Sequence, residues 1–240
     1  MNLRVRLACD HSPNFSCNLN WKLTMQRVIC ISTLVLCLVG NFALAADDAK
    51  KTDSKKEEGF VPLFNGKDLS GWKVKGKEAG WKVKDGVIHS DAGKEGHWLL
   101  SEKQFGDYIL KVEWKVSEGG NSGVFIRCTE EGNPWVTGYE IQISNPKQDE
   151  SHCTGSLYSF VPVKNRPDES ADKWHTFEIE CRGSVITVKS DDVVCIDKFD
   201  QSTDEKTKTK PLKAHIGLQD AHAAAGNTIE YRNIRIKELK

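Results

Sequence analysis

Along most of the chain beyond residue 60, hydrophobic and polar residues alternate with a period of two. The stretch TGYEIQIS (137–144) does so without a break, because Tyr139, Ile141 and Ile143 alternate with polar residues. Successive side chains of a β-strand point to opposite faces, so this stretch predicts a strand with one apolar and one polar face. No segment sustains a period of 3.6 residues, and internal repeats are absent.

Turn residues separate the alternating runs. WKVKDGVIHS (81–90) holds Asp85-Gly86 between two short runs, which predicts a two-residue hairpin turn. A second hairpin is predicted about Arg182-Gly183. Further runs lie at 108–116, 122–128, 193–197, 215–220 and 228–239. Many short strands with Gly- and Asn-rich turns predict an all-β sandwich or barrel, with a sheet packed on one side and open on the other.

The first 58 residues have a different pattern. An apolar run at 28–40 follows Lys22 and Arg27 and precedes the small-residue segment Ala43-Leu44-Ala45. The run is too short for a membrane helix, so residues 1–45 are predicted to be a secretory signal peptide. Met25 would be a natural start of translation, and residues 1–24 are then either an upstream extension or a long n-region. Residues 46–58 are small and charged and predict a disordered tether. Residues 59–240 then form one domain, which the signal peptide predicts to be secreted or periplasmic.

Charge and cysteine content narrow the functional class. Without residues 1–45, 30 basic and 33 acidic residues remain, a net charge of −3, which does not favour nucleic-acid binding.

Four cysteines lie in the domain and allow up to two disulfides. Cys181 and Cys195 lie on neighbouring runs and are the candidate pair. No pair has CxxC spacing, so a structural zinc site is not expected, and a divalent cation is supported by no recognisable motif.

Polar residues of several strands are predicted to converge on one sugar-binding cleft. Carboxylates, amides and Arg bind hydroxyl groups, and aromatic faces cover a sugar ring. The candidates for substrate binding are Glu113, Asn121, Arg127, Gln142, Tyr158, Gln219, Trp98 and Trp135, and the candidates for catalysis are Glu140, Asp220 and His222.

Several candidates also have a structural alternative. Glu113 stands between Lys111 and Lys115 and could form a surface ion pair. Arg127 could pair with Glu113 or Glu140 for structural reasons. Gln142 could be a solvated strand residue, and Asn121 could supply a left-handed turn conformation. For His89, His97, His175 and His215 a structural or surface role is expected.

Seven motifs in order carry a family resemblance: FVPLFNGKDLSGWK, WKVKDGVIHS, FGDYILKVEWKV, GGNSGVFIR, GYEIQI, TGSLY and IGLQD…IEYRNIRIKEL. Together they resemble the 3-keto-disaccharide hydrolase domain family over about residues 59–239. The resemblance implies a jelly-roll β-sandwich of the concanavalin A-like lectin/glucanase type. It also implies action on glycosides oxidised at C3 of glucose, and a partner oxidoreductase that forms the ketone. Many relatives read Gln-Asp-His-Gly after Gly-Leu, whereas here His222 stands one position later.

The polar face of 139–144 limits the chemistry. Related glucanases of this architecture carry several carboxylates along one strand, because ordinary glycoside hydrolysis needs a carboxyl pair flanking the bond. Here the face reads Glu140, Gln142 and Ser144, with one carboxylate. A C3 ketone acidifies the C2 hydrogen, so a single base, Glu140 or His222, could remove it and the C1 substituent could leave by elimination, followed by addition of water. Arg127 and Gln142 would face the enolate, and Asp220 would orient His222 or act as the acid.

Two other functional classes stay open at this point. The same fold serves non-catalytic glycan-binding domains, and a fold does not decide function. A conventional endoglucanase would release reducing ends from unoxidised β-glucan. The sequence does not identify the aglycone or the anomer.

Overall fold

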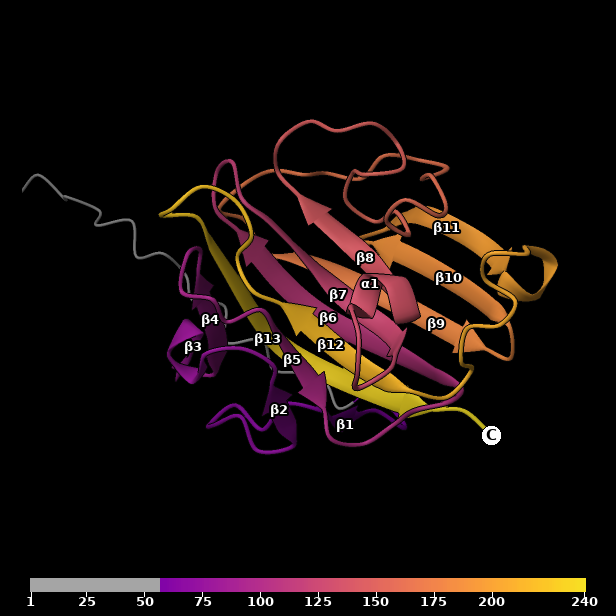
Figure 1. Ribbon diagram of the computed structural model, residues 1–240, viewed down its shortest axis with the longest axis horizontal. Coiled ribbons are helices and arrows are strands. Elements are labelled where there is room, and N and C mark those ends of the chain that lie inside the picture. The colour runs from indigo at the N-terminus through magenta and orange to yellow at the C-terminus, as the bar shows by residue number, and fades with distance from the viewer. Residues whose placement is uncertain (1–56) are drawn as a thin grey trace, which may run out of the picture. The chain divides into compact units, whose positions relative to one another are not determined.

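In the computed structural model, which describes residues 57–240, thirteen strands form two antiparallel sheets (Figure 1). The larger sheet has the order β11-β10-β9-β6-β13-β4-β3, with β1 beside β13, and the smaller sheet has the order β2-β5-β12-β7-β8. The larger sheet contains β1 (Val61–Pro62), β3 (Trp81–Lys84), β4 (Val87–Asp91), β6 (Tyr108–Val116), β9 (His175–Arg182), β10 (Val185–Ser190), β11 (Val193–Asp200) and β13 (Thr228–Glu238). The smaller sheet contains β2 (Trp72–Val74), β5 (Trp98–Ser101), β7 (Asn121–Cys128), β8 (Tyr139–Ser144) and β12 (His215–Gln219). Helical segments are short: α1 (Pro134–Thr137), η1 (Glu78–Gly80) and η2 (Gln201–Thr203).

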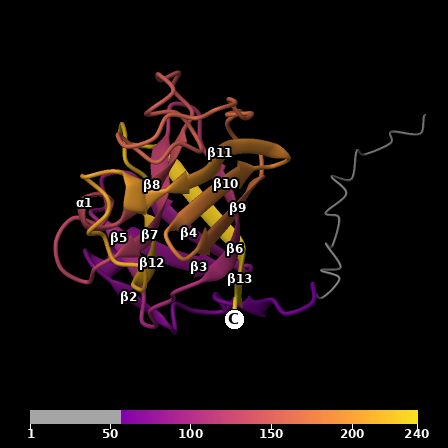
Figure 2. The same cartoon turned by 90° about the vertical axis from the view of Figure 1, so that its right-hand side faces the viewer.

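The two sheets form two layers with the core between them. Figure 2 shows β7 and β12 in one layer and β9 and β6 in the other, with α1 on the outer side of the smaller sheet. Apolar residues of both sheets make up one continuous core cluster, which includes the buried side chains of Trp72, Trp81 and Trp114. The predicted β-sandwich is therefore confirmed, because each sheet buries one apolar face against the other.

Burial alternates along the larger sheet as the sequence predicts. In β6 every second residue from Tyr108 to Val116 is buried, and Leu110 rather than Ile109 is the buried member of the first pair. β9 and β10 alternate in the same way. Their intermediate positions form the outer face of the larger sheet, which is solvated.

β7 and β8 depart from this alternation. All six residues of β8 and seven of the eight residues of β7 are buried. The segment after β8 covers its free edge, since Tyr158 donates its backbone N–H to the carbonyl of Glu140 at 2.9 Å and Gly155 donates to that of Gln142 at 2.9 Å. The free edge of β8 is thus covered, and its polar residues are buried rather than exposed to solvent.

Both predicted hairpins are present, and one has a shifted turn. Asp85 and Gly86 join β3 and β4 with φ of 51° and 79°, the left-handed backbone that a two-residue hairpin turn requires. In the second hairpin Arg182 pairs with Val185, so the turn residues are Gly183 and Ser184, one position later than predicted.

The predicted disulfide between Cys181 and Cys195 is wrong. Cys181 lies on β9 and Cys195 on β11, and β10 runs between these two strands. The order of the strands therefore separates two cysteines that the sequence places on neighbouring runs. Among the described residues the four cysteines, the other two being Cys128 and Cys153, are buried free thiols.

The predicted signal peptide at 1–45 and the predicted tether, apart from its last two residues, lie outside the described residues. Glu57, at the end of that tether, forms an ion pair with Lys111 of β6 at 3.0 Å. No helix within residues 57–240 has the length and apolar character needed to cross a membrane.

Candidate functional site

A pocket opens on the outer face of the smaller sheet. Its volume is about 360 Å³, within the range of sites that bind small molecules. Four strands of the smaller sheet form its floor, and the segments around α1, Tyr158 and His222 form its walls. The lining residues are His97, Trp98, Asn121, Trp135, Glu140, Gln142, Tyr158, Gln219, Asp220 and His222.

Strand register brings the floor residues together. Glu140 of β8 pairs with Phe125 of β7, and Gln142 pairs with Gly123. On the other side of β7, Gln219 of β12 pairs with Trp98 of β5. Because side chains alternate between faces, residues at these positions point to the outer face of the smaller sheet while their neighbours enter the core.

Glu140 is the deepest acidic group of the pocket. Only 5% of the residue is exposed, and burial raises the pKa of its carboxyl group to about 8, against a smaller lowering effect of the nearby Gln219 side chain. Its carboxyl group lies directly over Gly123, where an added Cβ would stand 2.4 Å from Oε1. Glycine at this position therefore makes the room that Glu140 occupies.

An amide chain extends from Glu140 across the floor. With the Gln142 amide oriented so that donors face acceptors, its nitrogen donates to Glu140 Oε1 at 3.1 Å and to the carbonyl of Ser122 at 3.2 Å. Its oxygen then accepts a hydrogen bond from Asn121 Nδ2 at 3.1 Å. The two amides fix the orientation of the carboxyl group and present polar groups to a ligand.

Asp220 is bound to the backbone of His97 and not to the side chain of His222. Its Oδ2 accepts a hydrogen bond from His97 N at 2.8 Å, and its own N–H donates to the carbonyl of His97 at 2.8 Å. Burial raises the pKa of Asp220, and this backbone hydrogen bond partly opposes the shift. His222 is exposed, and no side-chain hydrogen bond joins it to another described residue, so its imidazole is free to meet a ligand.

Aromatic rings form one wall of the pocket. Trp98 lies edge-on to Trp135 with ring centroids 6.0 Å apart, and Phe125 lies 6.5 Å from each of them. Tyr158 stands elsewhere on the rim, with the ring of His152 edge-on to its own at 5.0 Å. Flat apolar faces beside polar groups are typical of sugar sites.

His152 belongs to a short chain of hydrogen bonds outside the pocket. Its Nδ1 lies 2.9 Å from Asp149 Oδ1 and its Nε2 lies 3.1 Å from Ser159 Oγ, the order found in a hydrolase triad. The nearby N–H groups of Tyr158, Ser159 and Phe160 already donate to backbone carbonyls, so they offer no oxyanion hole. This chain instead holds the ring that packs against Tyr158.

Nine of the eleven predicted site residues line the pocket, and Glu113 is one of the two that do not. Glu113 lies on β6 in the larger sheet, whose polar face looks away from the pocket. There it accepts hydrogen bonds from Arg232 Nε at 2.7 Å and from Asn233 Nδ2 at 2.8 Å. Glu113 therefore does not line this pocket, and it forms an ion pair, as its structural alternative proposes.

Arg127 also lies outside the pocket. Its backbone has a φ of 53°, and the register between β7 and β12 shifts beside it, so a bulge breaks the alternation that would aim its side chain at the pocket. The guanidinium is buried instead, where it donates to Gln201 Oε1 and to the carbonyl of Gly183, both at 2.5 Å. Arg127 therefore cannot contact a ligand in the pocket, contrary to the prediction.

The sequence prediction missed His97. This residue was expected to be structural or on the surface, yet it lines the pocket with a φ of 54°. No periodic pattern marks it, because its placement depends on the distant Asp220, and the preceding Gly96 is the only local signal of an unusual backbone.

Nowhere in residues 57–240 do three or more His, Cys, Asp or Glu side chains gather in an arrangement that fits a metal ion. The divalent cation considered from the sequence stays an open prediction.

Comparison with known proteins identifies related chains. The sequence pattern of the family described as "3-keto-alpha-glucoside-1,2-lyase-like domain" matches residues 59–237. A 3-keto-disaccharide hydrolase of Bacteroides thetaiotaomicron is 27% identical over 233 residues, which cover 76% of this chain and 79% of that protein.

Solved structures share the architecture. A Parabacteroides distasonis protein classed with the glycosyl hydrolases superposes with a TM-score of 0.66 at 22% identity, over 79% of this chain and 98% of that one. SCLam, a non-specific endo-β-1,3(4)-glucanase of family GH16, superposes with a TM-score of 0.53 at 10% identity, over 75% and 91% of the two chains. The predicted jelly-roll fold of the concanavalin A-like lectin/glucanase type is confirmed.

Proposed function

Because the chain belongs to the family of 3-keto-alpha-glucoside-1,2-lyase-like domains, we propose that it is an enzyme that cleaves glycosides whose glucose unit carries a ketone at C3. One observation carries this proposal: the pocket holds a buried carboxyl group, Glu140, whose pKa of about 8 lets it accept and return a proton near neutral pH. The similarity to a 3-keto-disaccharide hydrolase supports the substrate class.

The ketone explains how one base can suffice. A carbonyl group at C3 makes the hydrogen on C2 acidic, because the resulting anion is delocalised onto the ketone oxygen. Glu140 takes this proton, the enolate forms, and the electron pair then expels the oxygen substituent from C1. The products of this half-reaction are an unsaturated 3-keto sugar and an alcohol, with the proton on Glu140.

Other pocket residues would donate hydrogen bonds or protons to the two oxygen atoms that gain negative charge, the ketone oxygen and the leaving oxygen at C1. The hydroxyl group of Tyr158 and the imidazole of His222 line the pocket, and neither side chain has a hydrogen-bond partner among the described residues. They are our candidates to donate to the enolate oxygen and to protonate the leaving oxygen. A positioned donor or acid typically contributes about 10²–10⁴-fold in rate.

Asp220 has a different part in this scheme. Since its carboxylate is hydrogen-bonded to the backbone of His97, it would hold His97 and Trp98 at the rim rather than orient His222.

In the second half-reaction water adds at C1 of the unsaturated sugar and Glu140 returns the proton to C2, which completes a net hydrolysis.

The proposal is tested by the products that the full chain releases from a 3-keto disaccharide and from its unoxidised parent. We expect free monosaccharide from the oxidised sugar alone, detected by mass spectrometry, with a transient product lighter by one water. Cleavage of the unoxidised parent would overturn the proposal. Saturable binding of both sugars without any release would identify a glycan-binding domain instead.

We propose further that an oxidoreductase acts before this enzyme, since an alcohol at C3 must be oxidised before this chemistry can begin.

We also propose that the chain is exported. Export rests on the sequence pattern of residues 1–45. N-terminal sequencing of protein from the periplasm or the medium should find a start near residue 46, and full-length protein confined to the cytoplasm would refute it.

A further inference from the structure

A tyrosine of the opposite sheet reaches the underside of the pocket floor. Tyr231 lies on β13 of the larger sheet and is fully buried. Its hydroxyl oxygen stands 2.8 Å from Ser122 Oγ, 3.0 Å from the carbonyl oxygen of Gly123 and 3.2 Å from that of Gln219. One phenol thus crosses the sandwich and contacts both central strands of the smaller sheet, β7 and β12.

The contact lies where the main chains of these two strands separate. β12 pairs with β7 through Leu218 and Val124, and the next main-chain bond between the two segments is His222 N to the carbonyl of Asn121, at 2.7 Å. Between these points Ser122 Oγ donates to the carbonyl of Gln219 at 2.9 Å. Two hydroxyl groups therefore take the place of the missing ladder bonds and satisfy buried carbonyls.

Both strands held in this way support Glu140. The carboxyl group of Glu140 lies over Gly123, where it fills the space that an added Cβ would need, and the side chain of Gln219 is near enough to lower its pKa. These are the two residues whose carbonyl oxygens contact the Tyr231 hydroxyl. If the hydroxyl is lost, Gly123 and Gln219 can shift relative to each other, and the carboxyl group between them moves.

We propose that Tyr231 is a positioning residue that sets the place of the Glu140 carboxyl group from below the floor, with Ser122 as its partner; this rests on the proposed function. The phenol touches neither the substrate nor the reacting atoms. A displacement of about 1 Å of a catalytic group costs on the order of 10²-fold in rate, so a hydroxyl buried in the core can affect turnover.

The test is Tyr231→Phe, which removes one oxygen and keeps the ring in the core. We expect kcat on a 3-keto-glucoside to fall about 10- to 100-fold while KM changes less than threefold, because the pocket rim is untouched. Tyr108→Phe is the matched control: Tyr108 is also buried in the sandwich, against Phe105, and does not contact the pocket floor. Its kcat should equal that of the wild type.

The Ser122→Ala variant and the double variant test whether Ser122 and Tyr231 act through one hydrogen-bond network. Ser122→Ala should lower kcat in the same direction, and the double variant should fall less than the product of the two single effects, since both act through one network. If Tyr231→Phe does not fold, Ser122→Ala alone decides. Equal kcat in wild type and the folded variant, or equal losses in Tyr231→Phe and Tyr108→Phe, would overturn the proposal.

The titration of Glu140 separates this proposal from the proposed function. Carbon-13 NMR of the Glu140 carboxyl group needs no substrate, and its midpoint should move by at least half a pH unit in Tyr231→Phe and not in Tyr108→Phe. An unmoved midpoint contradicts the positioning role. If the midpoint moves but the wild type cleaves no 3-keto sugar, the function fails and the positioning role stands.

Discussion

At the scale of single residues, the pocket depends on how Glu140 is surrounded. Its neighbours are a glycine and amides, and no basic side chain is among the lining residues except the histidines. Burial without a nearby cation disfavours the charged form, which is why the pKa of this carboxyl group rises to about 8. A carboxylate with a raised pKa is a stronger base than an ordinary one, which suits removal of a weakly acidic C2 hydrogen.

The raised pKa predicts the pH dependence of turnover. If Glu140 is the base, it must be ionised in the free enzyme, so kcat/KM should rise about tenfold per pH unit below pH 8 and level off above it. Initial rates on a 3-keto-glucoside between pH 5 and 9, corrected for the rate without enzyme, give the profile. A rate that falls as the pH rises from 5 to 8 would contradict the role of ionised Glu140 as the base.

The same shift predicts how stability depends on pH. The pKa of Glu140 rises from an ordinary 4.5 to about 8 on folding, so between these pH values the folded state binds more protons than the unfolded state. Stability is therefore full below pH 4.5 and is lost as the pH rises through 8. Glu140→Gln removes this loss, so the variant should gain up to roughly 5 kcal/mol over the wild type above pH 8.

Urea unfolding of Glu140→Gln and wild type at pH 4.5 and pH 9 measures this difference. The two proteins should differ little at pH 4.5 and most at pH 9. Equal differences at both pH values would show that the carboxyl group is not the cause.

The sequence predicts which side chains face the pocket where a strand alternates regularly, and not where the alternation is broken or the strand lies in the other sheet. Glu140 and Gln142 share a face because β8 is regular, and the sequence predicts this correctly. Arg127 has the right spacing, but the left-handed backbone at that residue turns its side chain away, and nothing in the local pattern signals it. Glu113 has the right alternation but lies in the other sheet, and sheet membership depends on long-range pairing.

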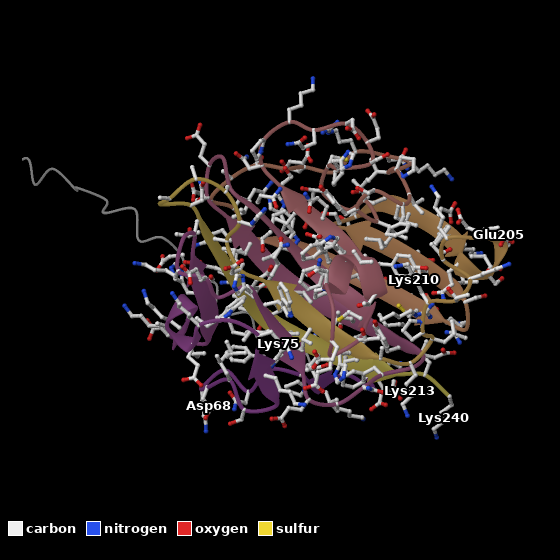
Figure 3. The ribbon with its side chains drawn as sticks, viewed as in Figure 1. Asp68, Lys75, Glu205, Lys210, Lys213 and Lys240 are labelled. Carbon is white, nitrogen blue, oxygen red and sulfur yellow. The ribbon has the colours of Figure 1, made fainter. Side chains whose placement is uncertain are left out.

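At the scale of elements, the short helix α1 places an aromatic wall over the floor. It carries Trp135, and Lys210 from the 204–214 segment binds its C-terminal end through the carbonyls of Val136 and Gly138, the latter at 2.7 Å. A cation at the end of a helix satisfies carbonyls that have no partner within it. In Figure 3 Lys210 lies beside the smaller sheet near α1, whereas Lys213 lies lower, at the edge of the molecule.

Lys210→Met should loosen this wall. The methionine chain keeps the length of the side chain, but it loses the cation–π contacts of the ammonium group with Tyr139 and Phe160, whose ring centroids lie 5.0 and 4.5 Å away, and it cannot bind the carbonyls. Since Trp135 only holds the substrate in this account, KM should rise about 3- to 10-fold with kcat within twofold. Lys213→Met, on an exposed residue, is the control. An unchanged KM for Lys210→Met would remove α1 from substrate binding.

The strands were largely predictable and the covering segments were not. Alternation together with Asp85-Gly86 gives the β3–β4 hairpin, because that turn type needs particular residues. The wall segments have no periodic pattern, since each is fixed by contacts with distant residues, as Lys210 fixes α1 and the carbonyl of Glu140 fixes Tyr158.

At the scale of the whole described domain, the two outer faces differ in chemistry. The outer face of the larger sheet carries paired charges, such as Lys115 with Glu230 at 2.6 Å and Lys189 with Glu178 at 2.9 Å. The outer face of the smaller sheet carries the pocket, with buried groups that have raised pKa values. Exposed ion pairs contribute little to stability, whereas buried carboxyl groups with raised pKa values are typical of functional sites, so the groups suited to proton transfer lie on one face.

The role of Glu140 as the base is tested by the rate of aglycone release from a 3-keto-glucoside by wild type and by Glu140→Gln, at substrate concentrations that saturate both. A buried amide of the same shape keeps the pocket but cannot take the C2 proton. We expect kcat to fall at least about 100-fold while the Kd for the oxidised sugar stays within a few-fold. Equal release by the two proteins would contradict the assignment of Glu140 as the base.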